Sequence, residues 1–187
     1  MQVEYRYIAP AELNIRLFSH FTRHQVVTDC LRRSGDRWEV RSNPFTDDWS
    51  AADYERLVCC LINTLQTGGA VFGAFIAGEL KGFASVEAMP LGSRGQYIDL
   101  SCLHVSEELR NRGIGTVLFG KAAEWAASRG AEKLYISSHS AVETQAFYRR
   151  MGCTDAEEYS DAHVTAEPYD RQLEFALPHS SHTPHKA

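Results

Sequence analysis

The chain has 187 residues, of which 44% are hydrophobic, 11% aromatic and 23% charged, a composition typical of one globular domain. Its formal net charge of −5 argues against nucleic acid and anionic membrane surfaces as partners. The sequence contains no apolar run of membrane-spanning length, and its first ten residues lack the build of a signal peptide. Five cysteines without C-x-x-C spacing indicate reduced core thiols, no zinc site and a cytoplasmic location.

The first part of the chain predicts one strand and two helices. Residues 3–8 alternate between apolar and polar side chains and predict a strand. Apolar residues at helical spacing predict a helix over 11–27, and the charged, turn-rich segment 32–50 is expected to be a loop. Ser50 and Asp53 form a capping-box pattern, so a second helix is expected to begin after Ser50.

The rest of the chain predicts alternating strands and helices. In chain order these are a hairpin over 70–89 turning at Gly78, strand 96–105, helix 112–129, strand 133–138, a helix ending at Gly152, and strand 171–177. Ser140 and Glu143 form a second capping-box pattern at the start of the last helix. This order predicts a single mixed α/β domain over residues 1–178, followed by a flexible tail at 179–187.

The segment RNRGIGTVLFGKA, residues 110–122, contains parts of three phosphate-binding motifs. A P-loop is excluded because Ala122 replaces the hydroxyl that binds magnesium, and because Val117 and Leu118 are expected on the buried face of the helix. A dinucleotide fingerprint is excluded because Leu118 replaces the third glycine. The remaining pattern, R-x-x-G-x-G, predicts an anion site at a helix N-terminus, although two solvated arginines beside a glycine-tolerant helix start would look the same.

A second motif supports one interpretation of the first. The helix ending FYRRMGC, residues 147–153, follows R-x-x-G-x-G in the order and element type of the GNAT superfamily of acyl-CoA-dependent N-acetyltransferases, with Cys153 in place of an aromatic residue. Region 96–152 therefore resembles that superfamily. The resemblance implies an α/β fold with a mixed, mostly antiparallel central sheet, splayed between its fourth and fifth strands and flanked by helices. It also implies an acyltransferase that moves an acetyl group from acetyl-CoA to a primary amine by direct attack in a ternary complex, without a metal.

The resemblance implies where acetyl-CoA (coenzyme A) binds. The pantetheine arm would lie in the splay against the backbone of Leu103, His104 and Val105, and the pyrophosphate at the start of the following helix. The residues implied for the pyrophosphate are Arg110, Asn111, Arg112, Gly113, Ile114, Gly115 and Thr116. Phe147 and Ser140 complete the predicted cofactor site. Ala141 stands where many relatives carry the asparagine that holds pantetheine, so Ser140 or His139 would have to substitute.

The resemblance also implies catalytic residues. Tyr148 matches the tyrosine beside the cofactor sulfur, and a phenol with a reference pKa of about 10 can donate a proton at neutral pH. A core aromatic is the alternative. Asp99 matches a position where the histone-acetylating branch carries a glutamate as general base, and its shorter side chain would need a bridging water. Glu87 and His104 compete for this role, but strand alternation places His104 on the face opposite to Asp99 unless a bulge intervenes.

The acceptor is less defined by the sequence. Acidic and aromatic residues expected at the entrance suit a cationic amine, although a solvated acidic surface is equally compatible. These residues are Asp47, Asp48, Trp49, Glu157, Glu158, Asp161, Glu167 and Asp170. Segment 37–50 is long enough to form a lid, which favours a small-molecule amine over a peptide. Acetylation of a protein N-terminus or lysine and a non-catalytic acyl-CoA sensor are the alternative functions, and the family resemblance suggests a homodimer.

Overall fold

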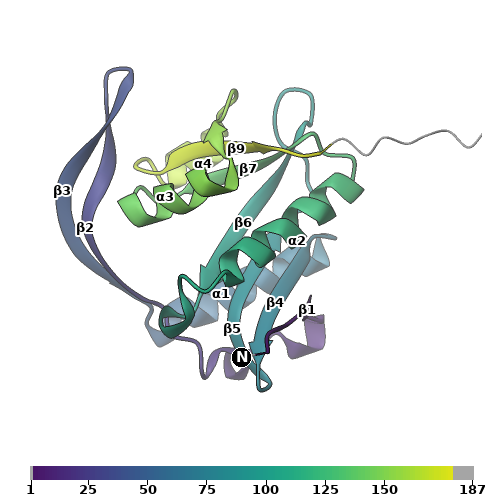
Figure 1. Cartoon of the computed structure of the whole chain (residues 1–187). Coiled ribbons are helices and arrows are strands. Elements are labelled where there is room, and N and C mark those ends of the chain that lie inside the picture. Colours follow the sequence, from purple (N-terminus) through teal and green to yellow (C-terminus); the bar gives the residue numbers. More distant parts are fainter. Residues whose placement is uncertain (1, 179–187) are drawn as a thin grey trace, which may run out of the picture.

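A computed structural model describes residues 2–178 of the chain (Figure 1). Its main sheet has seven strands in the order β1-β4-β5-β6-β7-β9-β8. Their bounds are β1 Glu4–Tyr7, β4 Ala70–Ile76, β5 Glu79–Val86, β6 Tyr97–Val105, β7 Lys133–Ser138, β8 Thr154–Asp155 and β9 Arg171–Ala176. Neighbouring strands are antiparallel except for β6 and β7, which are parallel. The mixed, mostly antiparallel sheet expected from the sequence is confirmed, whereas the expected tail 179–187 lies outside the described residues.

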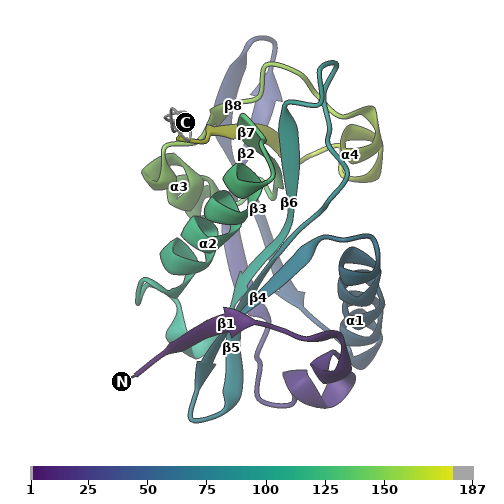
Figure 2. The ribbon, with the colours of Figure 1, turned by 90° about the vertical axis from the view of Figure 1, so that its right-hand side faces the viewer.

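Two long helices cover opposite faces of this sheet, as Figure 2 shows. Helix α1, Ala51–Gln66, buries Leu57 and Leu61 against one face, and α2, Ile114–Ser128, packs on the other. Two shorter helices follow, α3 at Val142–Met151 and α4 at Asp161–Ala166. Because each face of the sheet is apolar, one helix on each side is what buries both.

Several local predictions hold. Ala77 and Gly78 both have positive φ, 50° and 83°, as the tight turn of the predicted hairpin requires. The capping box of α1 is formed: the Ser50 side chain accepts from the Asp53 N–H, and Asp53 accepts from the Ser50 N–H. Other details differ. The N-cap of α3 is Ala141, with no capping side chain among the described residues, and Val117 on α2 is 40% exposed instead of buried.

The segment between residues 10 and 48 differs from its prediction. The expected helix over 11–27 is instead two 3-10 turns, Pro10–Glu12 and Ile15–Phe18, followed by the start of a strand. The expected loop is a two-stranded hairpin made of β2, His24–Ser34, and β3, Arg37–Asp48. Of the apolar residues at helical spacing, Leu13 and Phe21 do reach the core and Leu17 is half-buried, but they lie in or next to 3-10 turns, so the spacing indicated burial and not an α-helix.

Candidate active site

Strands β6 and β7 separate along their length. They pair only over Tyr97–Asp99, opposite Lys133–Tyr135, whereas β6 stays paired with β5 from Leu100 to Val105. Beyond Asp99 the β7-facing edge of β6 therefore has no pairing with β7. This is the predicted splay, because β6 and β7 are the fourth and fifth strands of the sheet in chain order, counting β1 first and leaving the separate hairpin aside.

Strand β2, together with the residues just before it, spans the wide end of this splay. At the β6 side, the Glu107 N–H donates to the Thr22 carbonyl at 3.0 Å. At the β7 side, the Leu31 N–H donates to the Ser140 carbonyl at 2.8 Å, and Cys30 forms an isolated bridge with Ala141. The hairpin β2–β3 is thus attached to both sides of the opening, and it forms one wall of the site.

The N-terminus of α2 lies at the end of β6. Gly113 is its N-cap, with φ 83°, and no side chain of the described residues caps the helix. Asn111 also has positive φ, 61°, so consecutive N–H groups in this turn can converge on an anion. A Cβ at Gly113 would meet nothing within 4 Å, which leaves the first-turn N–H groups open. The Ile114 side chain is buried, so that residue offers only its backbone.

The remaining predicted pyrophosphate residues surround this turn. Arg112 and Thr116 are exposed, and the Arg110 Nε donates to the Val105 carbonyl at 3.3 Å, which ties its half-buried side chain to the end of β6. A Cβ at Gly115 would lie 3.4 Å from the Phe147 ring and 3.7 Å from Val105. Elements α2, α3 and β6 therefore meet closely at Gly115, where a larger residue would crowd the splay.

Tyr148 on α3 faces the core next to the splay. Its side chain is 7% exposed, and its ring packs against Phe147 and Phe119 with centroid distances of 5.1 Å and 6.3 Å. Burial raises the pKa of the phenol, and nearby Cys153 and Cys102, followed by the carboxylates Asp170 and Asp99, raise it further. The phenol is therefore protonated at neutral pH. Within residues 2–178, its hydroxyl has no hydrogen-bond partner.

A β-bulge reverses the side-chain alternation in the second half of β6. Val86 pairs with Leu100 while Ser85 pairs with Cys102, so Ser101 is an extra residue that inverts the alternation. His104 consequently lies on the same face as Asp99, contrary to the alternation expected without a bulge. Its ring is enclosed by Trp49 and Phe83, at centroid distances of 4.8 Å and 5.3 Å.

Asp99 is paired with a residue that the sequence analysis missed. Its Oδ2 lies 3.0 Å from Nε2 of His163 on α4, and its Oδ1 is buried without a partner among the described residues. The hydrogen bond to Asp99 raises the pKa of His163, whose ring stacks on Tyr135 with centroids 5.4 Å apart. Because α4 has only six residues and no distinctive motif, the sequence held no signal for this pair.

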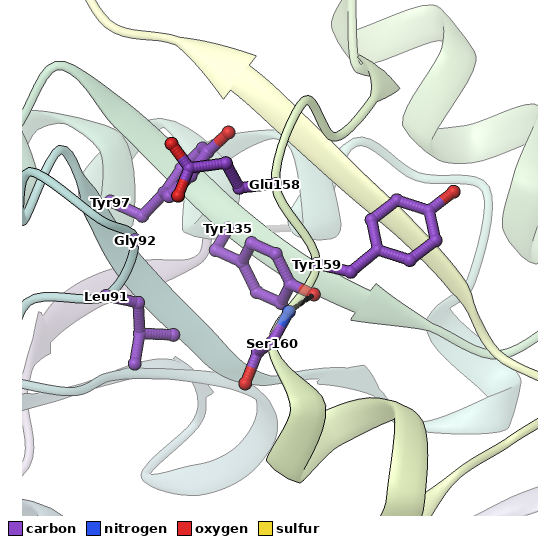
Figure 3. Close-up of a pocket in the computed structure, with 7 residues that line it drawn as sticks. All are labelled: Leu91, Gly92, Tyr97, Tyr135, Glu158, Tyr159 and Ser160. Carbon is purple, nitrogen blue, oxygen red and sulfur yellow. Dashed lines mark hydrogen bonds between the residues drawn. The ribbon is translucent and has the colours of Figure 1, made fainter.

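A small cavity of about 80 Å³ lies between Tyr97, Tyr135 and the segment that precedes α4 (Figure 3). The Tyr135 hydroxyl accepts from the Ser160 N–H at 2.9 Å and donates to Gln172 at 2.6 Å. These bonds hold the start of α4, the helix that carries His163, against β7.

Other candidates make contacts within the chain. Glu87 accepts hydrogen bonds from Ser101 at 2.6 Å and from Thr64 at 2.8 Å, which join β6 and α1. The Ser140 hydroxyl is buried and accepts from Arg32, and His139 Nδ1 accepts from the Ala141 N–H at 3.1 Å.

Most of the acidic residues expected at the acceptor entrance are also engaged. Asp47 pairs with Arg23 at 2.6 Å, Asp48 with His24, and Glu157 with Lys133 at 2.7 Å. Glu158 accepts from the Ser93 N–H at 2.7 Å. These four residues therefore do not form a cluster of unpaired carboxylates at the acceptor entrance.

The sequence profile of the acetyltransferase (GNAT) family matches residues 35–153. The chain belongs to this family. As a GNAT acetyltransferase it is an acyltransferase, in agreement with the fold, and no helix among residues 2–178 is long and apolar enough to cross a membrane. A comparison with curated proteins gives no significant match.

Solved structures share the GNAT fold over nearly the whole chain. A nourseothricin acetyltransferase is 22% identical, with a TM-score of 0.64 over 95% of this chain and 99% of that one. A putative streptothricin acetyltransferase from Bacillus anthracis str. Ames, in complex with acetyl coenzyme A, is 14% identical, with a TM-score of 0.67 over 95% and 98%. An IAA acetyltransferase from Bacillus cereus ATCC 14579 is 18% identical, with a TM-score of 0.55 over 94% and 100%.

Proposed function

We propose that this GNAT acetyltransferase moves an acetyl group from acetyl-CoA to the primary amine of a small molecule. The observation that carries the proposal is the coincidence of three features at the splay: an unpaired edge of β6, an open helix N-terminus at Gly113, and the protonated phenol of Tyr148. A helix N-terminus attracts a phosphate, and an unpaired strand edge attracts an extended amide chain. Coenzyme A carries both groups.

The residues present fit the coenzyme. The turn at Asn111–Gly113 has the left-handed residues that gather N–H groups around an anion, and Arg110 and Arg112 add positive charge. The backbone of Leu103–Val105 would pair with the pantetheine arm, beside Phe147 and Ser140. The solved relative from Bacillus anthracis contains acetyl coenzyme A, which supports the assignment by analogy of fold.

The protein's own groups support a direct transfer. When bound, acetyl-CoA supplies an electrophilic thioester carbonyl carbon and a thiolate leaving group. We assign Tyr148 to donate a hydrogen bond or proton to the departing sulfur. We assign the Asp99–His163 pair to take the proton that the acceptor ammonium must lose before its nitrogen, as a neutral amine, attacks the thioester. The N–C bond forms as the C–S bond breaks, so the products are the amide, the thiol and one proton.

An acyl-cysteine intermediate is disfavoured by the thiols nearby. Burial raises the pKa of Cys102 to about 12 and that of Cys153 to about 12, so both are protonated at neutral pH and are weak nucleophiles.

Strand β2 spans the wide end of the splay, and an extended peptide would have to pass it, which favours a small acceptor. The neighbours named for nourseothricin and streptothricin support the same size class.

The proposal is tested by incubating the protein with acetyl-CoA and a panel of small amines and peptides. Release of free thiol and a matching increase in the mass of an amine are expected. Tight acetyl-CoA binding in calorimetry, combined with no thiol release for any amine, would argue instead for a non-catalytic sensor. Faster reaction with protein or peptide amines would argue for a modifying enzyme.

A further inference from the structure

A second, larger cavity lies beside the catalytic residues. Its volume of about 590 Å³ is within the range of ~300–1,000 Å³ usual for small-molecule sites. Its lining residues come from the hairpin β2–β3, which stands at the left edge of the molecule in Figure 1, from α4 and from the segment that leads into β9. The residues that matter for its chemistry are Arg32, Arg33, Trp38, Arg41, Tyr169 and Asp170.

The outer part of this cavity is cationic. Of its described lining residues three are arginines, all on the hairpin, and one is acidic. Arg41 is 3.4 Å from Glu39, an exposed pair that neutralises it only weakly. Arg32, on the same face of the hairpin as Arg41, uses its Nη1 for the Leu31 carbonyl at 3.0 Å and for Ser140, which leaves its other N–H groups for a ligand. Such groups bind carboxylates through paired hydrogen bonds.

Aromatic rings form the walls between these charges. The Arg32 guanidinium lies 5.0 Å from the centre of the Tyr169 ring, and the Arg171 guanidinium lies 5.1 Å from the centre of the Trp38 ring. Tyr169 is 68% exposed, so one of its faces is open to a ligand. The cavity thus offers apolar contact surface in addition to charge.

The inner end of the cavity adjoins the catalytic residues. Asp170 accepts a weak hydrogen bond from Ser137 at 3.4 Å, and its carboxylate raises the pKa values of both His163 and Tyr148. Burial and the neighbouring Glu167 raise the pKa of Asp170 to about 6, so it remains mainly ionised at neutral pH. An amine held by Asp170 would therefore lie next to the groups assigned to the transfer.

We infer that this cavity is the acceptor site and that the acceptor is an amine which also carries a carboxylate and an aromatic or apolar group. This inference rests on the proposed function. The amine points toward Asp170, the carboxylate is bound by Arg41 beside Arg32, on the same face of the hairpin, and the apolar part lies against Tyr169. A polycationic amine is disfavoured, because three arginines would repel it. The inferred acceptor therefore differs from the cationic amine suggested by the acidic residues of the sequence.

The test compares free dipeptides with an aromatic second residue, such as Gly-Phe, with their C-terminal amides and with spermidine. The free peptide and its amide share the amine and the ring and differ only in the carboxylate. We expect kcat/KM to be about tenfold higher for the free peptide than for the amide, and higher than for spermidine. Equal rates for peptide and amide, or faster acetylation of spermidine, would overturn the inference.

A variant pair locates the effect on the hairpin. Arg41→Gln should remove most of the preference for the free carboxylate, while Arg37→Gln, on the same hairpin but outside the cavity, should keep it. Both side chains are exposed, so folding is not at risk. If no amine is acetylated, the proposed function fails, and calorimetric binding of Gly-Phe then decides the inference. Binding that is weakened in Arg41→Gln supports it, and its absence or insensitivity to this change refutes it.

Discussion

His163 Nε2 on α4 lies 3.0 Å from the Asp99 carboxylate on β6, at the last residue of β6 that pairs with β7. The pair connects α4, which lies next to the acceptor cavity, to the point where β6 and β7 begin to separate. The hydrogen bond to Asp99 raises the pKa of His163. A substitution of Asp99 should therefore be detected in the titration of His163.

We predict that Asp99→Asn lowers the pKa of His163, as measured by NMR titration of its ring. The raised pKa also has a consequence for stability. It stabilises the folded state fully below the unfolded value of about 6.5, and this contribution disappears as the pH rises through the higher folded value. His163→Gln should thus destabilise the protein more at about pH 5.5 than at about pH 8.5. His20→Gln, at an exposed position, is the control, and a pH-independent effect of His163→Gln would contradict the pairing.

Tyr148→Phe removes a single oxygen atom from a buried ring. If the phenol assists the leaving sulfur, kcat should fall by about 10²–10⁴, the usual contribution of a general acid, with little change in acetyl-CoA affinity. Stability should not decrease, because that hydroxyl has no hydrogen-bond partner within residues 2–178. Tyr7→Phe, at a side chain that is 60% exposed, is the matched control. Unchanged kcat in Tyr148→Phe would remove this residue from the mechanism.

The turn between β6 and α2 could be predicted from the sequence because its cause is local. Gly113 takes a left-handed conformation, and the apolar spacing after it is that of one helix, so motif and element coincide. The hairpin β2–β3 could not be predicted in this way. Strand β3 is largely exposed and β2 buries only Val27, Cys30 and Leu31, so the charged residues of the hairpin resemble a loop. Its attachment depends on distant contacts such as Leu31 with Ser140.

Several site residues could not be predicted for the same reason, because their positions depend on contacts between segments that are distant in the sequence. The Ser101 bulge is set by the pairing of β6 with β5, and strand alternation alone gave the wrong face for His104. The expected capping role of Ser140 is replaced by its contact with Arg32, a residue of the hairpin. The pairing of His163 with Asp99 depends on the position of α4 next to β6. Each of these depends on segments that meet only in the folded protein.

Gly113→Asp and Gly130→Asp form a matched pair at the two ends of α2. Both glycines have positive φ, 83° and 81°, and a Cβ at either would meet nothing within 4 Å, so the backbone strain of about 1–2 kcal/mol is shared. If a diphosphate binds at the N-terminus, Gly113→Asp should weaken acetyl-CoA binding about 100-fold or more by repulsion, while Gly130→Asp keeps it. Calorimetry gives both affinities, and equal binding by the two variants would refute the assignment.

The same pair also has an expected order of stability. A carboxylate is favourable at a helix N-terminus and unfavourable at a C-terminus, by about 0.3–1 kcal/mol each. Gly113→Asp should therefore have a higher melting temperature than Gly130→Asp, although it is the variant expected to lose the coenzyme. This opposite order of stability and binding excludes general unfolding as the cause of lost affinity.

His104 should affect the acid stability of the protein in the direction opposite to His163. Its burial, followed by the charges of Arg23 and Arg110, lowers the pKa of its ring to about 3. The unfolded chain takes up this proton near its reference value of about 6.5, and the folded protein does not, so stability falls as the pH drops below that value. His104→Phe keeps an aromatic ring between Trp49 and Phe83 and removes the titration. Its free energy of unfolding, measured with urea, should fall less than that of the wild type between about pH 7 and about pH 4. Parallel pH curves for the two proteins would mean that the ring is protonated in the fold, and that the enclosure by Trp49 and Phe83 does not exclude charge.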